Sequence, residues 1–297
     1  MFTIDNPTVE QVLGVTAERP FHCTTMRILT AVEDEHTLSF LESDQFLTFV
    51  EQDARIEAVF IKPQLVEKVR RKDIVLLVHD DPRYCYAVLW NHVARAAYRR
   101  EPSVIDPSAV IDPSAYVAPE NVYIGPGVVV EPMATILPDS VIGKDSIIRA
   151  RAVVGSIGFG QKRTSRGIIS VFHDGKAILG ERVELGTASC VDKGLSPRHT
   201  VVGDDTKTDN FVHIAHNVHL GRGCFLAAHA MVAGSVTMGD EVWIGPSAAI
   251  SSEITIGSKA NITIGAVVTR NVEPGQKVSG NFAIDHTRYM AFLKTIR

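Results

Sequence analysis

The sequence predicts a mainly β protein in which a long triangular β-solenoid follows an α/β domain. From about residue 104 onward, an aliphatic residue returns every six positions. Four positions after each of these residues, a second small or aliphatic residue occurs. Residues 1–100 show no such repeat. We therefore expect an α/β domain at 1–100, a solenoid at 104–275 and a tail with one short helix at 276–297.

The clearest block of the repeat contains twelve six-residue units in register, over residues 202–268. Neither the period of a helix nor the alternation of a long strand explains a repeat of six with two inward positions. Three short strands joined by tight corners would form one coil from three such units, in which inward residues stack from coil to coil. Blocks over 105–148 and 179–191 bring the total to between seven and eight coils. A β-sandwich is the alternative, but its strands usually recur about every 8 to 12 residues.

Glycine follows the first inward residue in many units, for example at Gly186 and Gly245. We expect these glycines at corners where a side chain would clash or where φ is positive. The repeat lapses over 154–178 and 193–201, so that we expect loops leaving the solenoid there. Loops on a rigid scaffold often carry binding residues.

The first 100 residues contain two short apolar segments, 57–61 and 74–78, whose composition predicts buried strands. Asp81 followed by Pro82 predicts the start of a helix. The apolar stripe of that helix is expected to contain Cys85, Val88, Leu89, Val93 and Ala96. Near the other end of the chain, residues 284–297 are expected to form a short helix that closes the solenoid with Tyr289, Phe292 and Leu293.

Composition excludes several classes of function. The chain has 30 Lys and Arg against 34 Asp and Glu, a formal charge of −4, so that we expect no nucleic-acid partner. Its four cysteines show no CxxC spacing, which indicates a reducing compartment and argues against a structural zinc site held by thiolates. We expect no bound metal. The sequence shows neither a signal peptide nor a transmembrane segment, and we expect a cytoplasmic protein.

Four of the eleven histidines lie close together in the sequence, namely His213, His216, His219 and His229. With the inward positions taken by Ile214 and Val218, we expect His213, His216, Asn217 and His219 to face outward or to lie at a corner. Imidazole is the natural general base near neutral pH. Acyl transfer needs such a base, because a proton must leave the attacking amine or hydroxyl.

Several motifs resemble one family closely, the UDP-3-O-acylglucosamine N-acyltransferases of lipid A biosynthesis, within the hexapeptide-repeat acyltransferase superfamily. These motifs are Gly158-Phe159-Gly160, the segment LGERVELG at 179–186, Val191-Asp192-Lys193-Gly194, Asp209-Asn210 and Ile214-Ala215-His216-Asn217. The resemblance covers nearly the whole chain. It implies that the solenoid is a left-handed parallel β-helix of hexapeptide repeats and that the N-terminal domain binds uridine.

The resemblance also implies roles for individual residues. His216, with Asn217 beside it, would be the catalytic base that takes a proton from the amine of a UDP-linked amino sugar as the amine attacks an acyl thioester. The substrate-binding residues implied are Gly158, Phe159, Asp192, Asp209, Asn210, His229, Glu253 and the series Phe40, Ser43 and Phe46. The last three correspond to the family's uracil-binding Phe-x-x-Asn-x-x-Tyr pattern. No tightly bound cofactor is implied, and the active sites would lie in clefts of a homotrimer.

Several positions depart from the family pattern. Glu253 stands for a second family histidine, His229 for a glycine, and Ser43 for the uracil-binding asparagine. These changes leave open the acyl chain, expected to be 3-hydroxyacyl, and the amino sugar. The acyl donor is expected to be a thioester of acyl carrier protein or of coenzyme A. Coenzyme A is included because residues 264–281 are also similar to the closing segment of coenzyme-A-dependent hexapeptide acetyltransferases. Such an enzyme, acting on another nucleotide-linked amino sugar for surface polysaccharide, is the alternative.

Two other classes of function remain open at this point. Carbonic anhydrases of the γ class use the same solenoid with histidine ligands to zinc, which His213, His216 and His219 could supply. A non-catalytic solenoid that binds or scaffolds is the third class. Covalent catalysis by cysteine is the weaker mechanism, because no cysteine lies beside a histidine in the sequence and Cys224 is at an inward position.

Overall fold

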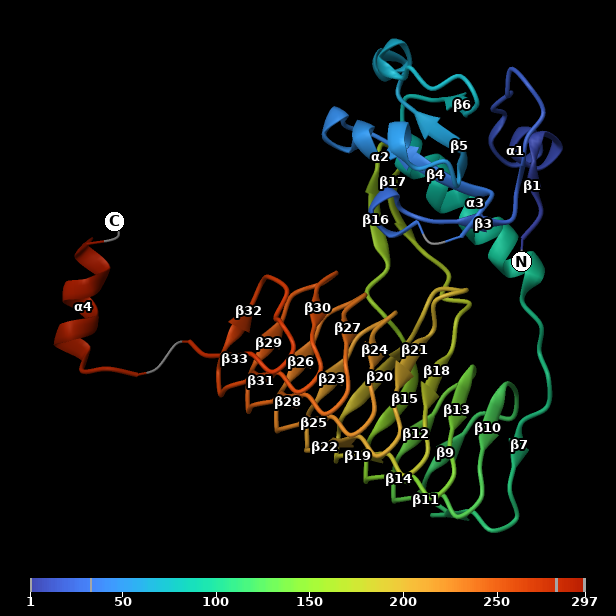
Figure 1. Cartoon of the computed structure of the whole chain (residues 1–297). Helices are drawn as coiled ribbons and strands as arrows, with labels where there is room; N and C mark the ends of the chain where they lie inside the picture. The colour runs from blue at the N-terminus through green and yellow to red at the C-terminus, as the bar shows by residue number, and fades with distance from the viewer. Residues whose placement is uncertain (1, 33, 281–282, 296–297) are drawn as a thin grey trace. The chain divides into compact units, whose positions relative to one another are not determined.

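The structure, a computed structural model, describes residues 2–32, 34–280 and 283–295 (Figure 1). The chain forms two compact units. The first comprises Met1–Arg99 and Phe159–Asp174, and the second comprises Arg100–Gly158 and Gly175–Arg297. The first unit is therefore built from two separate pieces of chain, whereas the sequence suggested the first 100 residues alone.

A parallel four-stranded sheet, in the order β3-β4-β5-β6, forms the centre of the first unit. Its strands are β3 (Thr25–Met26), β4 (Thr37–Leu41), β5 (Ile56–Ile61) and β6 (Val75–Val78), and a second pair is β1 (Ile4–Asp5) with β2 (His22–Cys23). The helices are α1 (Asn6–Leu13), α2 (Leu47–Gln52) and α3 (Pro82–Ala97), with the 3₁₀ turns η1 (Leu29–Ala31), η2 (Asp44–Phe46) and η3 (Pro63–Lys68). The two strands expected at 57–61 and 74–78 are confirmed as β5 and β6.

Helix α3 begins where the sequence indicated. The Asp81 carboxylate accepts a hydrogen bond from the backbone N–H of Tyr84 at 2.9 Å, which caps the helix. Cys85, Leu89 and Val93 are buried as expected, but the expected stripe was wrong at two positions: Val88 is half-buried and Ala96 is exposed. Ala87, Trp90 and Ala94 are buried instead. The buried face is wider than one stripe because α3 packs on the central sheet and also on a hairpin from residues 159–174.

That hairpin consists of β16 (Gln161–Thr164) and β17 (Gly167–Ser170). The amide of Asn91 donates to the carbonyl of Ser170 at 2.9 Å and accepts from the backbone N–H of Phe172 at 2.7 Å. The indole of Trp90 donates to the carbonyl of Phe172 at 2.9 Å. Side chains of α3 thus form hydrogen bonds with the backbone N–H and C=O groups at the end of β17 and just after it. Of the loop expected at 154–178, residues 159–174 belong to the first unit.

The Asp81 carboxylate gives the first unit a pH-dependent stability. Burial disfavours the charge of Asp81, but hydrogen bonds from Ser165 and from the backbone of Tyr84 outweigh it and hold the pKa of this carboxyl below its usual range. A lowered folded-state pKa stabilises the fold above the unfolded-state pKa of about 3.9, and this stabilisation is lost as pH falls through the folded-state value. We expect the advantage of the wild type over Asp81→Asn to shrink as pH falls below about 5.

The measurement is urea unfolding of the first unit, followed by fluorescence of Trp90 in a Trp243→Phe background, since the chain has two tryptophans. Asparagine can still cap α3 through its oxygen, but its amide nitrogen cannot accept the hydrogen bond that Oδ2 of Asp81 accepts from the backbone N–H of Ser165, so that the variant removes this bond together with the charge. Asp80→Asn changes a neighbouring carboxylate outside the cap and serves as the control. A stability difference that does not change with pH would contradict the assignment.

The second unit is a left-handed parallel β-helix, which confirms the predicted fold class. Each coil contributes one strand to each of three parallel sheets, and successive strands of the regular part pair one coil apart, as Trp243 does with Asn261. In the described part of the chain, sheet I contains β7 (Val104–Ile105), β10 (Val122–Ile124), β13 (Ser140–Ile142), β18 (Ala177–Leu179), β21 (Thr200–Val202), β24 (His219–Leu220), β27 (Thr237–Met238) and β30 (Thr255–Ile256). Sheet II contains β8 (Val110–Ile111), β11 (Val129–Val130), β14 (Ile147–Ile148), β19 (Glu184–Leu185), β22 (Lys207–Thr208), β25 (Phe225–Leu226), β28 (Trp243–Ile244), β31 (Asn261–Ile262) and β33 (Lys277–Val278). Sheet III contains β9 (Tyr116–Val117), β12 (Thr135–Ile136), β15 (Val153–Ile157), β20 (Cys190–Lys193), β23 (His213–Ile214), β26 (Met231–Val232), β29 (Ala249–Ile250) and β32 (Val267–Val268).

The core of the β-helix is the column of inward residues that the repeat predicted. Both inward positions are buried throughout 202–268, for example at Ile214 and Val218. The first coil differs, because Ile105 is 43% exposed and no earlier coil covers it. The repeat also missed β15 and β33. Gly155 and a bulge interrupt the pattern at β15, and β33 follows an irregular stretch of chain.

The glycines of the repeat are explained by close packing between coils and not by positive φ. A Cβ atom on Gly186 would lie 2.1 Å from the Asp209 carbonyl oxygen, and one on Gly245 would lie 2.7 Å from the Ile264 nitrogen. The left-handed conformation occurs two residues later in the repeat, where most coils have a residue with a side chain and some have glycine, such as Gly223. Asn217 (φ 60°), His229 (φ 60°) and Glu253 (φ 62°) all occupy this corner position.

Replacing Gly186 with alanine should destabilise the β-helix by about 1–3 kcal/mol, because the new methyl group can be accommodated only if two coils move apart. The expected result is a lower midpoint of urea unfolding, followed by fluorescence of Trp243 in the second unit. Gly280→Ala is the control, since a Cβ atom there meets nothing within 4 Å. Equal midpoints for the two variants would contradict this explanation.

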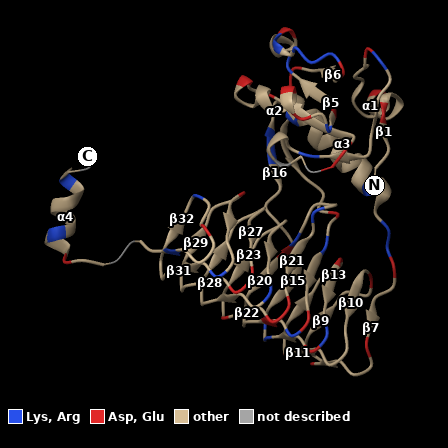
Figure 2. Ribbon diagram, in the orientation of Figure 1, with Lys and Arg blue, Asp and Glu red and all other residues tan. Residues whose placement is uncertain are grey.

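The predicted C-terminal helix is present as α4 (His286–Thr295). Tyr289 and Phe292 are exposed, Leu293 is half-buried, and no described residue of α4 is buried. The predicted closure of the solenoid by this helix is therefore wrong for the described residues, and the last two residues of the expected helix lie outside them. None of the described helices is long and apolar enough to cross a bilayer. Figure 2 shows Lys and Arg interspersed with Asp and Glu along the β-helix.

Candidate functional site

His216 lies at the corner between β23 of sheet III and β24 of sheet I, and its side chain is half-buried. Its Nδ1 atom lies 3.0 Å from Oδ1 of Asn217. The corner is tight, because Asn217 has a φ of 60°, a conformation that asparagine tolerates better than most residues. The backbone thus presents His216 at an edge of the triangular coil.

Asn217 lies at a corner, one of the two placements expected from the sequence, and its side chain is buried there. Its Nδ2 atom donates to the carbonyls of Leu195 at 3.1 Å and Arg198 at 2.6 Å. Since the amide nitrogen faces two carbonyl oxygens, the atom that faces His216 is the amide oxygen, an acceptor. Nδ1 of His216 therefore carries the proton, and Nε2 keeps its lone pair. This is the tautomer that a general base requires.

Two glycines flank the imidazole of His216. A Cβ atom on Gly158 would lie 2.8 Å from Cδ2 of the ring. A Cβ atom on Gly234 would lie 2.8 Å from Cε1 and 2.9 Å from Nε2. Gly158 was predicted as a site residue from the sequence, whereas Gly234 was not. The spacing of the repeat could have identified Gly234, because it follows His216 by three repeat units and so takes the same position in the next coil.

Replacing Gly234 with alanine is expected to lower kcat about tenfold, because the methyl group would displace the imidazole or occupy the space beside Nε2. The measurement is steady-state acyl transfer with the substrates proposed below. Gly280→Ala, where the added methyl group meets open space, provides the control. Full activity of the Gly234 variant would show that nothing needs to approach Nε2 from that side.

The loop over 193–201 is fixed against the same corner. Arg198 donates from Nε to the carbonyl of Asn217 at 3.1 Å and from Nη2 to the hydroxyl of Thr237 at 2.7 Å. Nε2 of His219 lies 2.9 Å from the carbonyl of His199 and must donate to it. The role of Arg198 was not predicted from the sequence, although the lapse in the repeat had marked this segment as a loop.

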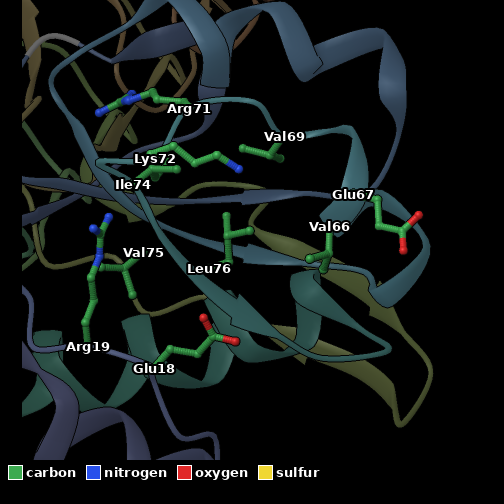
Figure 3. A pocket seen from close by; sticks show the side chains of 10 residues that line it. All are labelled: Glu18, Arg19, Val66, Glu67, Val69, Arg71, Lys72, Ile74, Val75 and Leu76. Carbon is green, nitrogen blue, oxygen red and sulfur yellow. The ribbon is translucent and has the colours of Figure 1, made fainter.

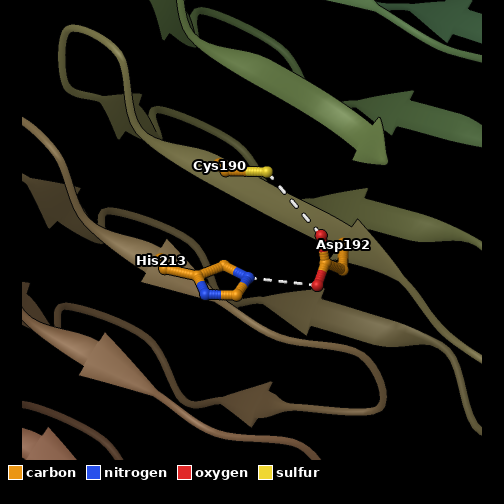
Figure 4. Close-up of side chains that lie close together, drawn as sticks. All are labelled: Cys190, Asp192 and His213. Carbon is orange, nitrogen blue, oxygen red and sulfur yellow. Dashed lines mark hydrogen bonds and ion pairs between the residues drawn. The ribbon is translucent and has the colours of Figure 1, made fainter. Parts of the chain in front are cut away.

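A second polar cluster lies on the outer face of sheet III. The buried carboxylate of Asp192 accepts a hydrogen bond from the hydroxyl of Ser156, and its Oδ2 lies 3.0 Å from Nε2 of His213 (Figure 4). The Sγ atom of Cys190 lies 3.6 Å from Oδ1 of Asp192. His213 is the exposed member, with 47% of its side chain accessible.

The carboxylate of Asp192 and the imidazole of His213 each stabilise the charged form of the other. Burial disfavours the charge of Asp192, but hydrogen bonds with His213 and Ser156 hold the pKa of this carboxyl below its usual range. The same hydrogen bond raises the pKa of His213. Burial raises the pKa of the Cys190 thiol to about 11, so that this cysteine is no activated nucleophile.

Other predicted site residues lie at a different corner of the same chain. Asn210 and His229 follow strands of sheet II and precede strands of sheet III, whereas His216 follows sheet III. The ring of His229 stacks on Phe211 with a centroid distance of 4.9 Å. Asp209 lines a groove of about 300 Å³ beside Phe225 and Trp243 on sheet II. One chain alone therefore does not bring these residues to His216.

Glu253 is exposed and lies on the same corner column as His216, two coils further along. The backbone N–H of Ser235 donates to the carbonyl of His216, and that of Glu253 donates to the carbonyl of Gly234 at 3.1 Å. These bonds place Glu253 two coils beyond this corner, at the position that Asn217 takes in its own coil. Phe159, by contrast, is 85% exposed and is grouped with the first unit.

The side chains of Phe40, Ser43 and Phe46, for which the sequence predicted uridine binding, are largely involved in the local structure of the first unit. The half-buried ring of Phe40 lies 5.0 Å from that of Tyr86, centroid to centroid. The Ser43 hydroxyl caps η2, and Phe46 packs against the core.

A separate cavity of about 390 Å³ in this unit does not contain Phe40, Ser43 or Phe46 (Figure 3). Its lining residues are Glu18, Arg19, Val66, Glu67, Val69, Arg71, Lys72, Ile74, Val75 and Leu76. The guanidinium of Arg71 donates to several backbone carbonyls, including those of Asp53 at 2.6 Å and Ile56 at 2.7 Å. This arginine therefore holds the fold of the unit together.

The three-histidine zinc site considered for His213, His216 and His219 is not formed by the described residues. Within that part of the chain, the grouping that could hold a metal ion is Cys190, Asp192 and His213, whose ligand atoms all lie within 4.8 Å of one another. His216 and His219 are instead directed to Asn217 and to the loop at His199.

Comparison with known proteins agrees with the sequence motifs. The chain matches the family model for bacterial transferase hexapeptide (six repeats) over residues 121–156 and 199–234. It is 48% identical over 151 residues to a UDP-3-O-acylglucosamine N-acyltransferase 2 of Legionella pneumophila, an alignment that covers 50% of this chain and 44% of that protein. It is 46% identical over 88 residues to a UDP-3-O-acylglucosamine N-acyltransferase of Caulobacter vibrioides, covering 30% and 26%.

Among solved structures, a UDP-N-acetylglucosamine acyltransferase from Campylobacter jejuni is similar with a TM-score of 0.46 and 21% identity, over 65% of this chain and 83% of that one. The chain spans less than half the length of the two curated relatives above, and at most half of this chain is aligned with them. The chain thus carries the bacterial transferase hexapeptide repeat, and over up to half of its length it is similar to the UDP-3-O-acylglucosamine N-acyltransferases, as its motifs predicted.

Proposed function

We propose that this protein is an N-acyltransferase that moves an acyl group from a phosphopantetheine thioester to the amine of a UDP-linked amino sugar, as in lipid A biosynthesis. The observation that carries the proposal is the state of His216. Asn217 holds the proton on Nδ1, and two glycines leave the ring without a covering side chain at those positions. The names of the similar proteins support the same class of reaction.

The reaction is a direct transfer. The neutral amine attacks the thioester carbonyl, and Nε2 of His216 takes the proton that becomes acidic as the C–N bond forms. Asn217 stabilises the resulting imidazolium through its amide oxygen. The tetrahedral oxyanion, held by backbone N–H groups of a corner, collapses and breaks the C–S bond. The imidazolium then returns the proton to the departing thiolate, so that the base is regenerated.

The second copy of the chain is part of this proposal. His216 follows a strand of sheet III, whereas Asp209, Asn210 and His229 precede strands of sheet III. Neighbouring chains of a homotrimer would bring the two ends together and would let Asp192 and Glu253 contact the sugar nucleotide. For the first unit we propose uridine binding through Phe40, Ser43 and Phe46.

The donor and the acceptor are tested together by offering the purified protein two thioesters and a panel of UDP-amino sugars. The thioesters are 3-hydroxyacyl groups on acyl carrier protein and on coenzyme A. We expect an acylated UDP-sugar of the corresponding intact mass with one donor at least. A folded protein that consumes neither thioester with any amino sugar would overturn the proposal and would favour the non-catalytic solenoid.

A further inference from the structure

We propose that Cys190, Asp192 and His213 bind one zinc ion on the outer face of sheet III. The three side chains supply one sulfur, one oxygen and one nitrogen, and these atoms all lie within 4.8 Å of one another (Figure 4). The site contains neither His216 nor Asn217, and it shares only Asp192 with the substrate-binding residues proposed above.

The strand pairing of the β-helix creates this arrangement. Cys190 on β20 is the direct register partner of His213 on β23, one coil later. Asp192 lies two positions after Cys190 on the same strand and pairs with Ser156 on β15. Adjacent strands of a rigid parallel sheet therefore position the ligands, so that little conformational entropy is lost when a metal binds.

The two distances that involve Asp192 end on different oxygens of its carboxylate and lie near the values of a tetrahedral site. Zinc binds sulfur at about 2.3 Å and nitrogen or oxygen at about 2.0–2.2 Å, which places ligand atoms about 3.3–3.6 Å apart. The Sγ atom of Cys190 is 3.6 Å from Oδ1 of Asp192, and Nε2 of His213 is 3.0 Å from Oδ2. Small rotations of the half-exposed imidazole would complete the geometry.

The donor set selects the metal. Thiolate and imidazole ligands favour zinc over magnesium or calcium, which prefer oxygen. One thiolate and one carboxylate would neutralise the two positive charges of the ion. The hydroxyl of Ser156 donates to Asp192 and would orient the carboxylate from outside the coordination sphere. Three protein ligands leave a fourth position for water, on the side where His213 is exposed.

Sequence spacing could not have shown this site. Most structural zinc sites held by thiolates are recognised by a CxxC pair, and this sequence has none. Here one cysteine is combined with an aspartate and a histidine from the neighbouring coil, and only the register of the sheet brings them together.

The test uses the full-length protein without an affinity tag, titrated with Co²⁺ as a spectroscopic probe. We expect one equivalent to bind with the visible bands of tetrahedral cobalt and a near-ultraviolet thiolate-to-cobalt charge-transfer band. One equivalent of Zn²⁺ should displace it, and Mg²⁺ should not. Cys190→Ser should abolish the charge-transfer band, and His213→Gln should weaken binding at least about tenfold.

Two controls keep the result interpretable. Cys224→Ala removes a cysteine that is buried in the core, and His216→Gln removes the proposed catalytic base, so that both should retain the cobalt spectrum. Circular dichroism shows whether each variant is folded. The proposal is overturned if the wild type binds neither ion at stoichiometric amounts, or if folded Cys190→Ser gives the wild-type spectrum. Loss of acyl transfer in His216→Gln with cobalt binding retained would separate this site from the proposed function.

Discussion

Replacing His216 with alanine is expected to lower kcat by about 100-fold or more, the usual contribution of a general base. The amine would then have to lose its proton to water as it attacks. KM for the sugar nucleotide should change much less, because the side chain acts on the transferred proton in the transition state. The measurement is steady-state kinetics with the donor and acceptor identified by intact mass.

The matched control is His92→Ala, which removes an exposed imidazole from α3 in the first unit. It should leave kcat unchanged. Circular dichroism and an unchanged unfolding midpoint would show that the His216 variant keeps its fold. Wild-type turnover by a folded His216→Ala protein would remove the mechanism proposed above.

Replacing Asn217 with glycine or alanine should also lower kcat by about 100-fold, because the proton on Nδ1 of His216 would no longer be held there. In the serine protease triad, a partner that allows the wrong tautomer costs about 10⁴-fold. The carbonyls of Leu195 and Arg198 would lose their donor as well, at a cost of about 1–3 kcal/mol if they stay buried. We therefore expect lower activity and lower stability together.

Comparison of the glycine, alanine and aspartate variants of Asn217 separates the loss of the tautomer from the loss of stability. Glycine adopts the positive φ without strain, so that Asn217→Gly measures the effect of losing the side chain alone. Asn217→Ala adds the cost of placing alanine in the left-handed conformation, about 1–2 kcal/mol. Asn217→Asp keeps an acceptor for Nδ1 and loses both donated hydrogen bonds. It should be as unstable as the glycine variant but closer to wild type in kcat. Equal activity in the glycine and aspartate variants would show that the tautomer does not matter.

Much of the fold could be predicted because the β-helix is a one-dimensional structure. A period of six follows directly from the geometry of a coil, and inward residues such as Ile214 and Val218 are buried where the pattern placed them. The hairpin formed by β16 and β17 could not be assigned in this way. Its contacts with Trp90 and Asn91 join positions that are far apart in the sequence, and no local pattern records such a contact.

The candidate site was predictable in part. The motif singled out His216 and Asn217 as candidates, and the structure places both at one corner, with Glu253 on the same corner column two coils further along. The burial of Asn217 was not foreseen, because outward or inward direction at a corner depends on the loop that covers it. Gly234 and Arg198 were missed, since their relation to His216 runs across coils and not along the chain.

By itself, the order of amino acids determined the repeating architecture of the solenoid, and it singled out His216 as the candidate base that we propose. These properties depend on short-range periodicity and on side-chain chemistry. Only the tertiary structure decided the tautomer of that histidine, the glycines beside it, and the meeting of a sulfur, a carboxylate and a second imidazole on one face. Those features arise from the register between neighbouring coils, because backbone pairing from one coil to the next brings together side chains that the linear spacing separates.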